Sequence, residues 1–123
     1  MKKIALVTCV APKLGIPAPA KKIYIGPIFE KIMHYANSID PDKIFILSGK
    51  YGLLKLDQVI EPYDVNLNLV SEEALQEWSN QVLADLAKEA DLEKDHFIFL
   101  TNVIYRKYLV EAIKYIEVPL YIE

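Results

Sequence analysis

Residues 43–64 read KIFILSGKYGLLKLDQVIEPYD and join an apolar run to a segment whose pattern is typical of neither helix nor strand. The run KIFILS, at 43–48, has the length and the β-branched and aromatic content of a buried strand. The rest carries glycines, tyrosines and carboxylates over a length that a plain connection between two elements does not need. The stretch therefore predicts a strand of a central sheet and a functional segment that begins at the end of that strand.

Three further apolar runs have the same strand-like character. They are KIALVTC at 3–9, HFIFLT at 96–101 and VPLYI at 118–122. Because each is apolar almost throughout, the runs suit a sheet that is covered on both faces. We interpret the first run as a strand and not as a signal peptide, since it is short and a loop follows it.

Apolar residues at helical spacing separate the runs. One helix is predicted to begin at Pro27, and a long one follows Ser71, a good N-cap that precedes two glutamates. A last helix is predicted after Asn102 and is expected to reach Ile116. Strands that alternate with helices predict a three-layer α/β/α domain with a mainly parallel, four-stranded sheet, and 123 residues suit a single domain, 1–123.

The composition is that of an ordinary soluble globular protein: 53% of the residues are hydrophobic, 25% are charged and the net charge is −3. No apolar run is long enough to cross a bilayer, so we expect no membrane partner. A single cysteine, Cys9, excludes an internal disulfide and favours a reducing cytoplasm. Acidic residues concentrate between Glu72 and Asp95, whereas many basic residues fall in or beside loops, which leaves room for a locally positive site.

Polar residues gather where the predicted strands end. Ligands of open parallel sheets bind at the carboxyl ends of the strands. Two long loops, a first at 12–22 and a second at 48–70, leave from that edge. We expect Asp64 to fold over the same edge. The predicted ligand-binding residues lie at the strand ends and in the segments that follow them: Thr8, Cys9, Lys13, Tyr24, Ser48, Gly49, Lys50, Tyr51, Gly52, Tyr63, Asn102 and Arg106.

Several of these residues have an ordinary structural alternative. Asn102 is also a good helix cap, and Gly49 and Gly52 suit a tight turn as well as a close approach to a ligand. Cys9 suits a small buried residue better than a catalytic thiol, because His96 begins a strand and so belongs at the opposite edge.

The common cofactor motifs are missing from the sequence. Gly49-Lys50 is not part of a P-loop, since Ile44 stands where the first glycine is required and Tyr51 where Ser or Thr should hold magnesium. No G-x-G-x-x-G is present, which argues against a dinucleotide-binding fold. The placement of the two histidines argues against a metal site, so we expect neither a metal nor a cofactor.

Glu61-Pro62-Tyr63-Asp64 holds the candidates for acid–base catalysis, Asp64 and Glu61. Pro62 fixes its own backbone and biases Glu61 toward an extended form, so the residues that follow are presented rigidly. Asp64 is equally suited to accept hydrogen bonds from loop amides. Tyr51 and Tyr63 lie beside glycine and proline, where a large ring could stack on a base or another ring-shaped ligand.

The same segment carries a resemblance to known families. Residues 48–54, SGKYGLL, and 60–64, IEPYD, resemble the S-[AG]-x-[YH]-G-L-[LV]…I-x-P-Y-[DR] signature of a family of small domains of unknown function. Upstream, Thr8-Cys9, Lys13 and Tyr24 resemble the first motif of that family, so the resemblance extends to about residue 68. The signature block is also similar to the core of the larger YaaA-like peroxide-stress proteins. That similarity implies protection against oxidative damage, and DNA binding through a region of a longer chain.

Glu61-Pro62-Tyr63 is similar to the acid-Pro-Tyr turn that activates water in uracil-DNA glycosylases. The similarity implies a carboxylate that positions water near a glycosidic carbon while a tyrosine packs against the base.

The site and the resemblance together predict a small cytoplasmic, enzyme-like domain that acts on a nucleotide, nucleoside or nucleobase, with cleavage or transfer of a glycosidic bond as the reaction. Lys13, Lys50 and Arg106 would face anionic groups of the ligand. The alternative is a noncatalytic module of a stress-response or phage-defence system that binds a small ligand or a nucleic acid. A third interpretation is that the signature is a packed loop needed only for stability.

Overall fold

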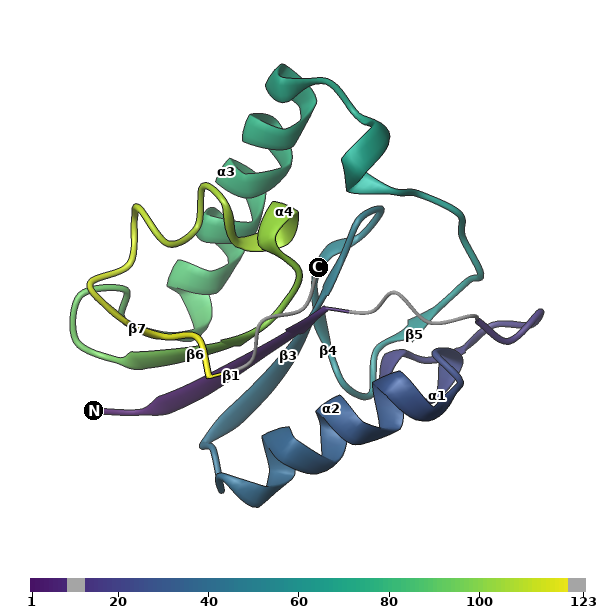
Figure 1. Ribbon diagram of the computed structural model, residues 1–123, viewed down its shortest axis with the longest axis horizontal. Helices are drawn as coiled ribbons and strands as arrows, with labels where there is room; N and C mark the ends of the chain where they lie inside the picture. The colour runs from purple at the N-terminus through teal and green to yellow at the C-terminus, as the bar shows by residue number, and fades with distance from the viewer. Residues whose placement is uncertain (9–12, 120–123) are drawn as a thin grey trace.

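The computed structural model describes residues 1–8 and 13–119 and contains a five-stranded sheet with the order β4-β3-β1-β6-β7 (Figure 1). Its central strands are β3 (Lys43–Ser48), β1 (Lys3–Thr8) and β6 (His96–Leu100). β7 (Tyr115–Glu117) continues the parallel sheet beyond β6, whereas β4 (Gly52–Lys55) runs antiparallel to β3. The fold is therefore mixed α/β with a mostly parallel central sheet, as the sequence predicts.

The central strands end at the same edge of the sheet. Val7 of β1 lies opposite Ile46 of β3 and Leu100 of β6, and the register is parallel on both sides. The polar residues Thr8 and Ser48 close their strands at this edge. The parallel direction that the predicted site requires is thus confirmed.

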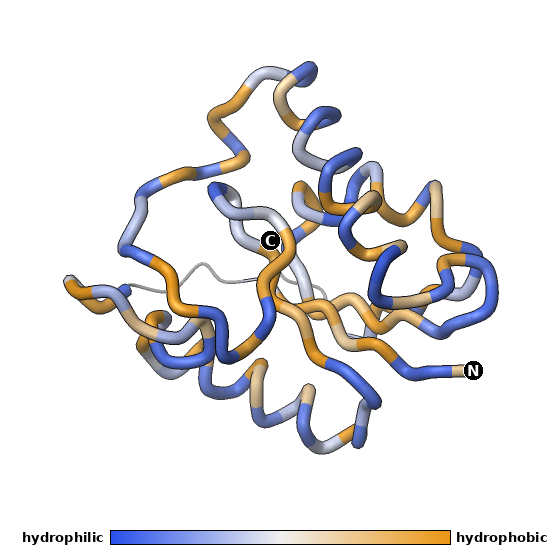
Figure 2. The backbone as a smooth tube through the Cα atoms, turned by 180° about the vertical axis from the view of Figure 1, so that it is seen from behind, coloured by the Kyte–Doolittle hydropathy of each residue, from blue (hydrophilic) through white to orange (hydrophobic). Residues whose placement is uncertain are grey.

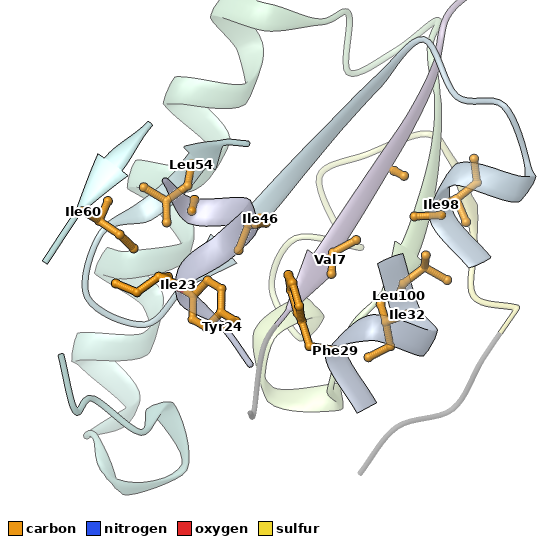
Figure 3. Packing of buried hydrophobic residues seen from close by; sticks show 13 residues of the cluster. Val7, Ile23, Tyr24, Phe29, Ile32, Ile46, Leu54, Ile60, Ile98 and Leu100 are labelled. Atoms are coloured by element: carbon orange, nitrogen blue, oxygen red, sulfur yellow. The ribbon is translucent and has the colours of Figure 1, made fainter. Parts of the chain in front are cut away.

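Side chains that alternate along the strands point to opposite faces and build two hydrophobic clusters. α1 (Ala20–Ile23) and α2 (Pro27–Ser38) contribute to the first, which Figure 3 shows and which consists of Ala5, Val7, Ala20, Ile23, Tyr24, Phe29, Ile32, Ala36, Ile46, Leu54, Ile60, Ile98 and Leu100. α3 (Glu72–Glu89) and the segment that begins with α4 (Val103–Arg106) pack in the second, whose strand residues are Ile4, Leu6, Phe45, Leu47, Phe97 and Phe99. Figure 1 shows α2 and α3 on opposite sides of the sheet.

The two longest helices begin at the predicted residues. α2 starts at Pro27, and Ser71 caps α3 by accepting a hydrogen bond from the amide of Ala74 over 3.1 Å. Glu72 and Glu73 lie in the first turn of α3, where the helix dipole favours negative charge. Figure 2 shows the strands mainly in orange and hydrophilic stretches along both helices, as expected for an apolar sheet between amphipathic helices.

The sheet has five strands and not the predicted four, because the segment after Ser48 forms a hairpin. Gly49, Lys50 and Tyr51 connect β3 to β4, and Ser48 pairs with Gly52. Gly52 has a φ of +74°, a conformation that residues with a Cβ rarely adopt. Sequence patterns do not separate so short a strand from the turn that precedes it.

The last helix and the last strand differ from the prediction. α4 ends at Arg106, and the chain continues in tight turns in which the Leu109 amide donates to the Arg106 carbonyl over 3.1 Å. Ile116, expected at the end of the helix, lies in β7. β7 also precedes the strand predicted at 118–122, and residues 120–122 of that range lie outside the described part of the chain.

The two long loops pair with each other. β2 (Ala18–Pro19) in the first loop and β5 (Val59–Ile60) in the second form a two-stranded antiparallel sheet. The amide of Ala20 adds a hydrogen bond of 2.8 Å to the carbonyl of Gln58. A short 3-10 turn, η1 (Leu67–Leu69), then leads toward α3. In the described ranges, 1–8 and 13–119, no helix is both long enough and apolar enough to span a membrane.

Candidate functional site

Buried polar side chains stand at the carboxyl ends of the three central strands. Thr8 ends β1, Ser48 ends β3, and Thr101 follows β6; each exposes 1% or less of its surface. Asn102, the next residue, is also buried. Buried polar groups need hydrogen-bond partners. The contacts of these side chains therefore show which of them are occupied within the chain and which are available to a ligand.

Thr8 and Asn102 hold each other across neighbouring strand ends. The Thr8 hydroxyl donates to Oδ1 of Asn102 over 3.0 Å and accepts the backbone N–H of Asn102 over 3.1 Å. Asn102 occupies the N-cap position of α4, but its side chain makes no capping hydrogen bond. The predicted cap position is confirmed, whereas the expected capping bond is wrong because the side-chain oxygen pairs with Thr8 instead.

Arg106 lies one turn into α4 and is also buried, with 9% of its surface exposed. Its Nη1 donates to the carbonyl of Thr101 over 2.5 Å. The peptide unit between Thr101 and Asn102 is therefore held at both ends, by the guanidinium at its carbonyl and by Thr8 at its N–H. The buried hydroxyl of Thr101 has no hydrogen-bond partner among the described residues. We refer to Thr8, Thr101, Asn102 and Arg106 as the strand-end group.

Ser48 organises the hairpin turn between β3 and β4. Its hydroxyl accepts hydrogen bonds from the amides of Lys50, over 3.2 Å, and Tyr51, over 3.0 Å. Its carbonyl accepts the indole N–H of Trp78 over 2.8 Å, which fixes the turn against α3. The serine is thus a structural part of the turn, and Trp78 is a supporting residue that the sequence did not place at this edge.

Both turn glycines have a structural reason to be glycine. A Cβ at Gly49 would lie 3.0 Å from the carbonyl oxygen of Val65, so the turn packs closely against a later part of the same long loop. Gly52 supplies the positive φ that closes the hairpin. The tight-turn alternative for this pair is confirmed, and a contact with a ligand stays a prediction.

Three tyrosines from separate segments, Tyr24, Tyr51 and Tyr63, form one aromatic cluster, which we call the tyrosine group. The hydroxyls of Tyr24 and Tyr63 are 2.5 Å apart and share a hydrogen bond. The ring of Tyr63 packs edge-on against both others, with centroid distances of 6.3 Å to Tyr24 and 5.6 Å to Tyr51. Tyr24 is buried among the residues drawn in Figure 3, whereas the other two are half-buried.

Two lysines bring positive charge to the tyrosine group. Nζ of Lys13 lies 4.5 Å from the ring centroid of Tyr63 and 5.7 Å from that of Tyr24. Nζ of Lys50 lies 5.3 Å from the ring centroid of Tyr51. These distances are those of cation–π contacts, so the ring faces and the ammonium groups form one surface.

The predicted acid–base residues, Asp64 and Glu61, are both exposed. The amide of Glu61 donates to the Tyr51 hydroxyl over 3.3 Å, so the loop that carries both carboxylates is fixed to the tyrosine group. Solvent water reaches the two carboxylates. Their catalytic role stays a prediction, as does any ligand role of Cys9, which lies outside the described residues.

A groove and a cavity lie near the two edges of the sheet, and of the tyrosine group only Tyr24 lines either of them. A groove of about 560 Å³ is lined by Tyr24, Phe29, Lys22 and neighbouring residues of α1 and α2. Another cavity, of about 710 Å³, lies between the start of β6 and β7 and is lined by His96 and Lys114, among others. This second cavity is at the amino ends of the strands and so lies away from the predicted site residues that the structure describes.

The amino edge also holds a carboxyl whose pKa is shifted, that of Asp95. Asp95 accepts hydrogen bonds from the backbone amides of Asp91 and Lys2, both over 2.8 Å, and these bonds hold the pKa of its carboxyl below the usual range. Within residues 1–8 and 13–119, no three His, Cys, Asp or Glu side chains are grouped so that they could hold a metal ion.

The fold and the site define a small α/β protein whose mostly parallel sheet carries buried polar residues and an aromatic, cationic surface at its carboxyl edge. The chain belongs to a family of unknown function, DUF6884, which matches residues 4–121. No curated protein sequence and no solved structure matches the chain.

Proposed function

We propose that the carboxyl edge of the sheet binds a nucleotide, nucleoside or nucleobase and that the domain cleaves or transfers its glycosidic bond. The observation that carries the proposal is the tyrosine group with Lys13 and Lys50 over its rings. Aromatic faces stack on bases of any sequence, and ammonium groups attract phosphates. The groove lined by Tyr24 adds two further lysines, Lys21 and Lys22, to the positive charge near this group.

Each part of the edge has a role in this proposal. Tyr51 and Tyr63 contact the base, and Lys13 faces an anionic group of the ligand. Asp64, with Glu61 beside it in the same exposed loop, positions water at the glycosidic carbon. The signature supports this assignment, because its two halves touch where the Glu61 amide meets the Tyr51 hydroxyl.

Base release from a panel of nucleosides and nucleotides tests the reaction. We expect turnover of at least one member by the wild-type protein and a loss of about 100-fold or more in Asp64→Asn, in keeping with the usual contribution of a general base. Asp57→Asn is the matched control, since Asp57 is an exposed carboxylate in the same long loop. Absence of both binding and base release across the panel would overturn the proposal.

The exposure of Asp64 and Glu61 favours a second candidate, a noncatalytic module that binds a ligand or nucleic acid. A phosphate-driven interaction with DNA or RNA weakens steeply with salt, because binding releases counterions. Binding measured from low to physiological salt, with Lys50→Ala as the test variant, checks this candidate. A salt-independent affinity would exclude a nucleic-acid partner of this kind.

The resemblance to the YaaA-like proteins is part of the same proposal. We place the signature of residues 48–54 and 60–64 with the YaaA-like peroxide-stress proteins, and the module with a stress-response or phage-defence system in the cytoplasm. The likeness of these residues to the YaaA-like signature supports the relationship. Assignment to the three-layer α/β/α class as one domain, 1–123, rests on helices that pack on both faces of the sheet.

A further inference from the structure

The side-chain amide of Asn102 has a fixed orientation. A threonine hydroxyl has one proton, and the hydroxyl of Thr8 directs it to Oδ1 of Asn102 while it accepts the backbone N–H of the same residue. Neither of the two hydrogen bonds between Thr8 and Asn102 therefore involves Nδ2 of Asn102. Its two N–H donors are left for an acceptor that the strand-end group itself does not provide.

Two neighbours of this amide point to the same kind of acceptor. The guanidinium of Arg106 is fixed at the Thr101 carbonyl, so a positive charge is held beside the peptide unit that carries Asn102. The hydroxyl of Thr101 is fully buried and makes no hydrogen bond, which is unusual because desolvation of a polar group is costly when nothing replaces its water. The Asn102 amide and the Thr101 hydroxyl thus have hydrogen-bonding capacity that the described chain leaves unused.

We propose that the strand-end group is a subsite for a phosphate group, in which Nδ2 of Asn102 donates to a phosphate oxygen, Arg106 supplies the charge and Thr8 is the positioning residue. This inference rests on the proposed function, because it names the part of a nucleotide that this edge holds. A phosphate offers several anionic oxygens, which suits an amide donor that lies beside a guanidinium charge.

Asn102→Asp separates the ligand role from the structural one. The aspartate keeps an oxygen that accepts from Thr8, but it replaces the Nδ2 donor with a negative acceptor that repels phosphate. We expect at least a tenfold loss of phosphate affinity, the lower end of what a hydrogen bond to a charged group contributes. A melting temperature near that of wild type would show that the fold survives.

Thr8 is tested by removal and rescue of its hydroxyl. Thr8→Val frees the Asn102 amide to turn, so we expect weaker phosphate binding, and Thr8→Ser, which restores the hydroxyl, should recover it. Lys107→Met is the matched control for loss of charge, since Lys107 follows Arg106 but pairs on the surface with Glu72 over 2.8 Å. The control should bind phosphate within about twofold of wild type, as expected for an exposed ion pair.

Calorimetric titrations with inorganic phosphate, adenosine 5′-monophosphate and adenosine distinguish the sources of the phosphate group. We expect the nucleotide to bind more tightly than adenosine by at least tenfold, and the difference to disappear in Asn102→Asp. Equal affinities for nucleotide and adenosine, or unchanged phosphate binding in Asn102→Asp, would overturn the subsite and leave the proposed function standing. Binding of inorganic phosphate that depends on Asn102, with no binding of any nucleoside or nucleotide of the panel and no base release, would support the subsite and remove the proposed function.

Discussion

Nζ of Lys13 lies 4.5 Å from the ring centroid of Tyr63, although the two residues belong to different long loops. The β2–β5 pairing and the hydroxyl contact between Tyr24 and Tyr63 hold these loops together. The first motif of the resemblance and its Pro-Tyr-Asp end therefore meet in one place. The two motifs, which are separate in the sequence, therefore contribute to one surface.

The hydroxyl of Tyr63 is expected to matter for stability, in contrast to the carboxylate next to it. Tyr63→Phe removes the hydrogen bond to Tyr24 and should lower the free energy of unfolding by about 1 kcal/mol. Asp64→Asn changes an exposed side chain and should stay within about 0.5 kcal/mol of wild type. Urea unfolding of both variants checks this. Equal losses of unfolding free energy in the two variants would mean that Asp64 stabilises the loop, which would contradict a purely catalytic role.

Removal of the Thr101 hydroxyl, unlike removal of the Tyr63 hydroxyl, is expected not to lower the free energy of unfolding. Thr101→Val keeps the shape of the side chain and removes a buried polar group that has no hydrogen bond, so the free energy of unfolding should be unchanged or higher by up to about 1 kcal/mol. Thermal and urea unfolding measure the change. A loss of more than about 1 kcal/mol would show that the hydroxyl has a partner in the folded chain.

The hairpin turn depends on the backbone of Gly52. Gly52→Ala places a Cβ on a residue with a φ of +74° and should cost about 1 to 2 kcal/mol of stability. Gly15→Ala is the matched control, since a Cβ there meets no atom within 4 Å. Its effect should be about 0.5 kcal/mol or less. If both variants unfold at the same urea concentration, the turn is less constrained than its geometry indicates.

Asp95 predicts a pH dependence of stability. Its pKa is lowered by hydrogen bonds from the amides of Asp91 and Lys2, so the folded state favours the charged form. The resulting stabilisation is fully present above the ordinary aspartate pKa and is lost as the pH falls through the lowered one. Asp95→Asn should therefore be less stable than wild type at neutral pH, by about 1 kcal/mol, and nearly equal to it in strong acid. A difference that does not change with pH would contradict this.

The sequence predicts the central sheet because the runs of β1, β3 and β6 are apolar and sharply bounded. Their parallel order, the N-cap at Ser71 and the polar edge at Thr8 follow from local rules and are confirmed. The hairpin at Gly52 was missed because its strand, Gly52–Lys55, is only four residues long and begins with a glycine. The helix after Asn102 was overestimated because the apolar spacing up to Ile113 is also satisfied by tight turns that place Leu109 and Ile113 in the core.

Contacts within the site are less accessible to sequence reasoning. Thr8 and Asn102 are distant in the chain, and nothing local in either segment indicates that the asparagine pairs with the threonine instead of capping its helix. The same holds for the indole N–H of Trp78 at the Ser48 carbonyl. Such pairings depend on strand register and helix docking, which the amino-acid pattern of one sequence does not specify.

The central claim is that the carboxyl edge of the sheet binds the ligand, and mapping of amide chemical shifts by NMR tests it most directly. On titration with adenosine 5′-monophosphate, the account predicts shifts at Thr8, at the Ser48–Tyr51 turn and at Asn102. Amides near His96 and Lys114, at the opposite edge, should not move. Shifts confined to that opposite edge, or no shifts at any ligand concentration, would contradict the account.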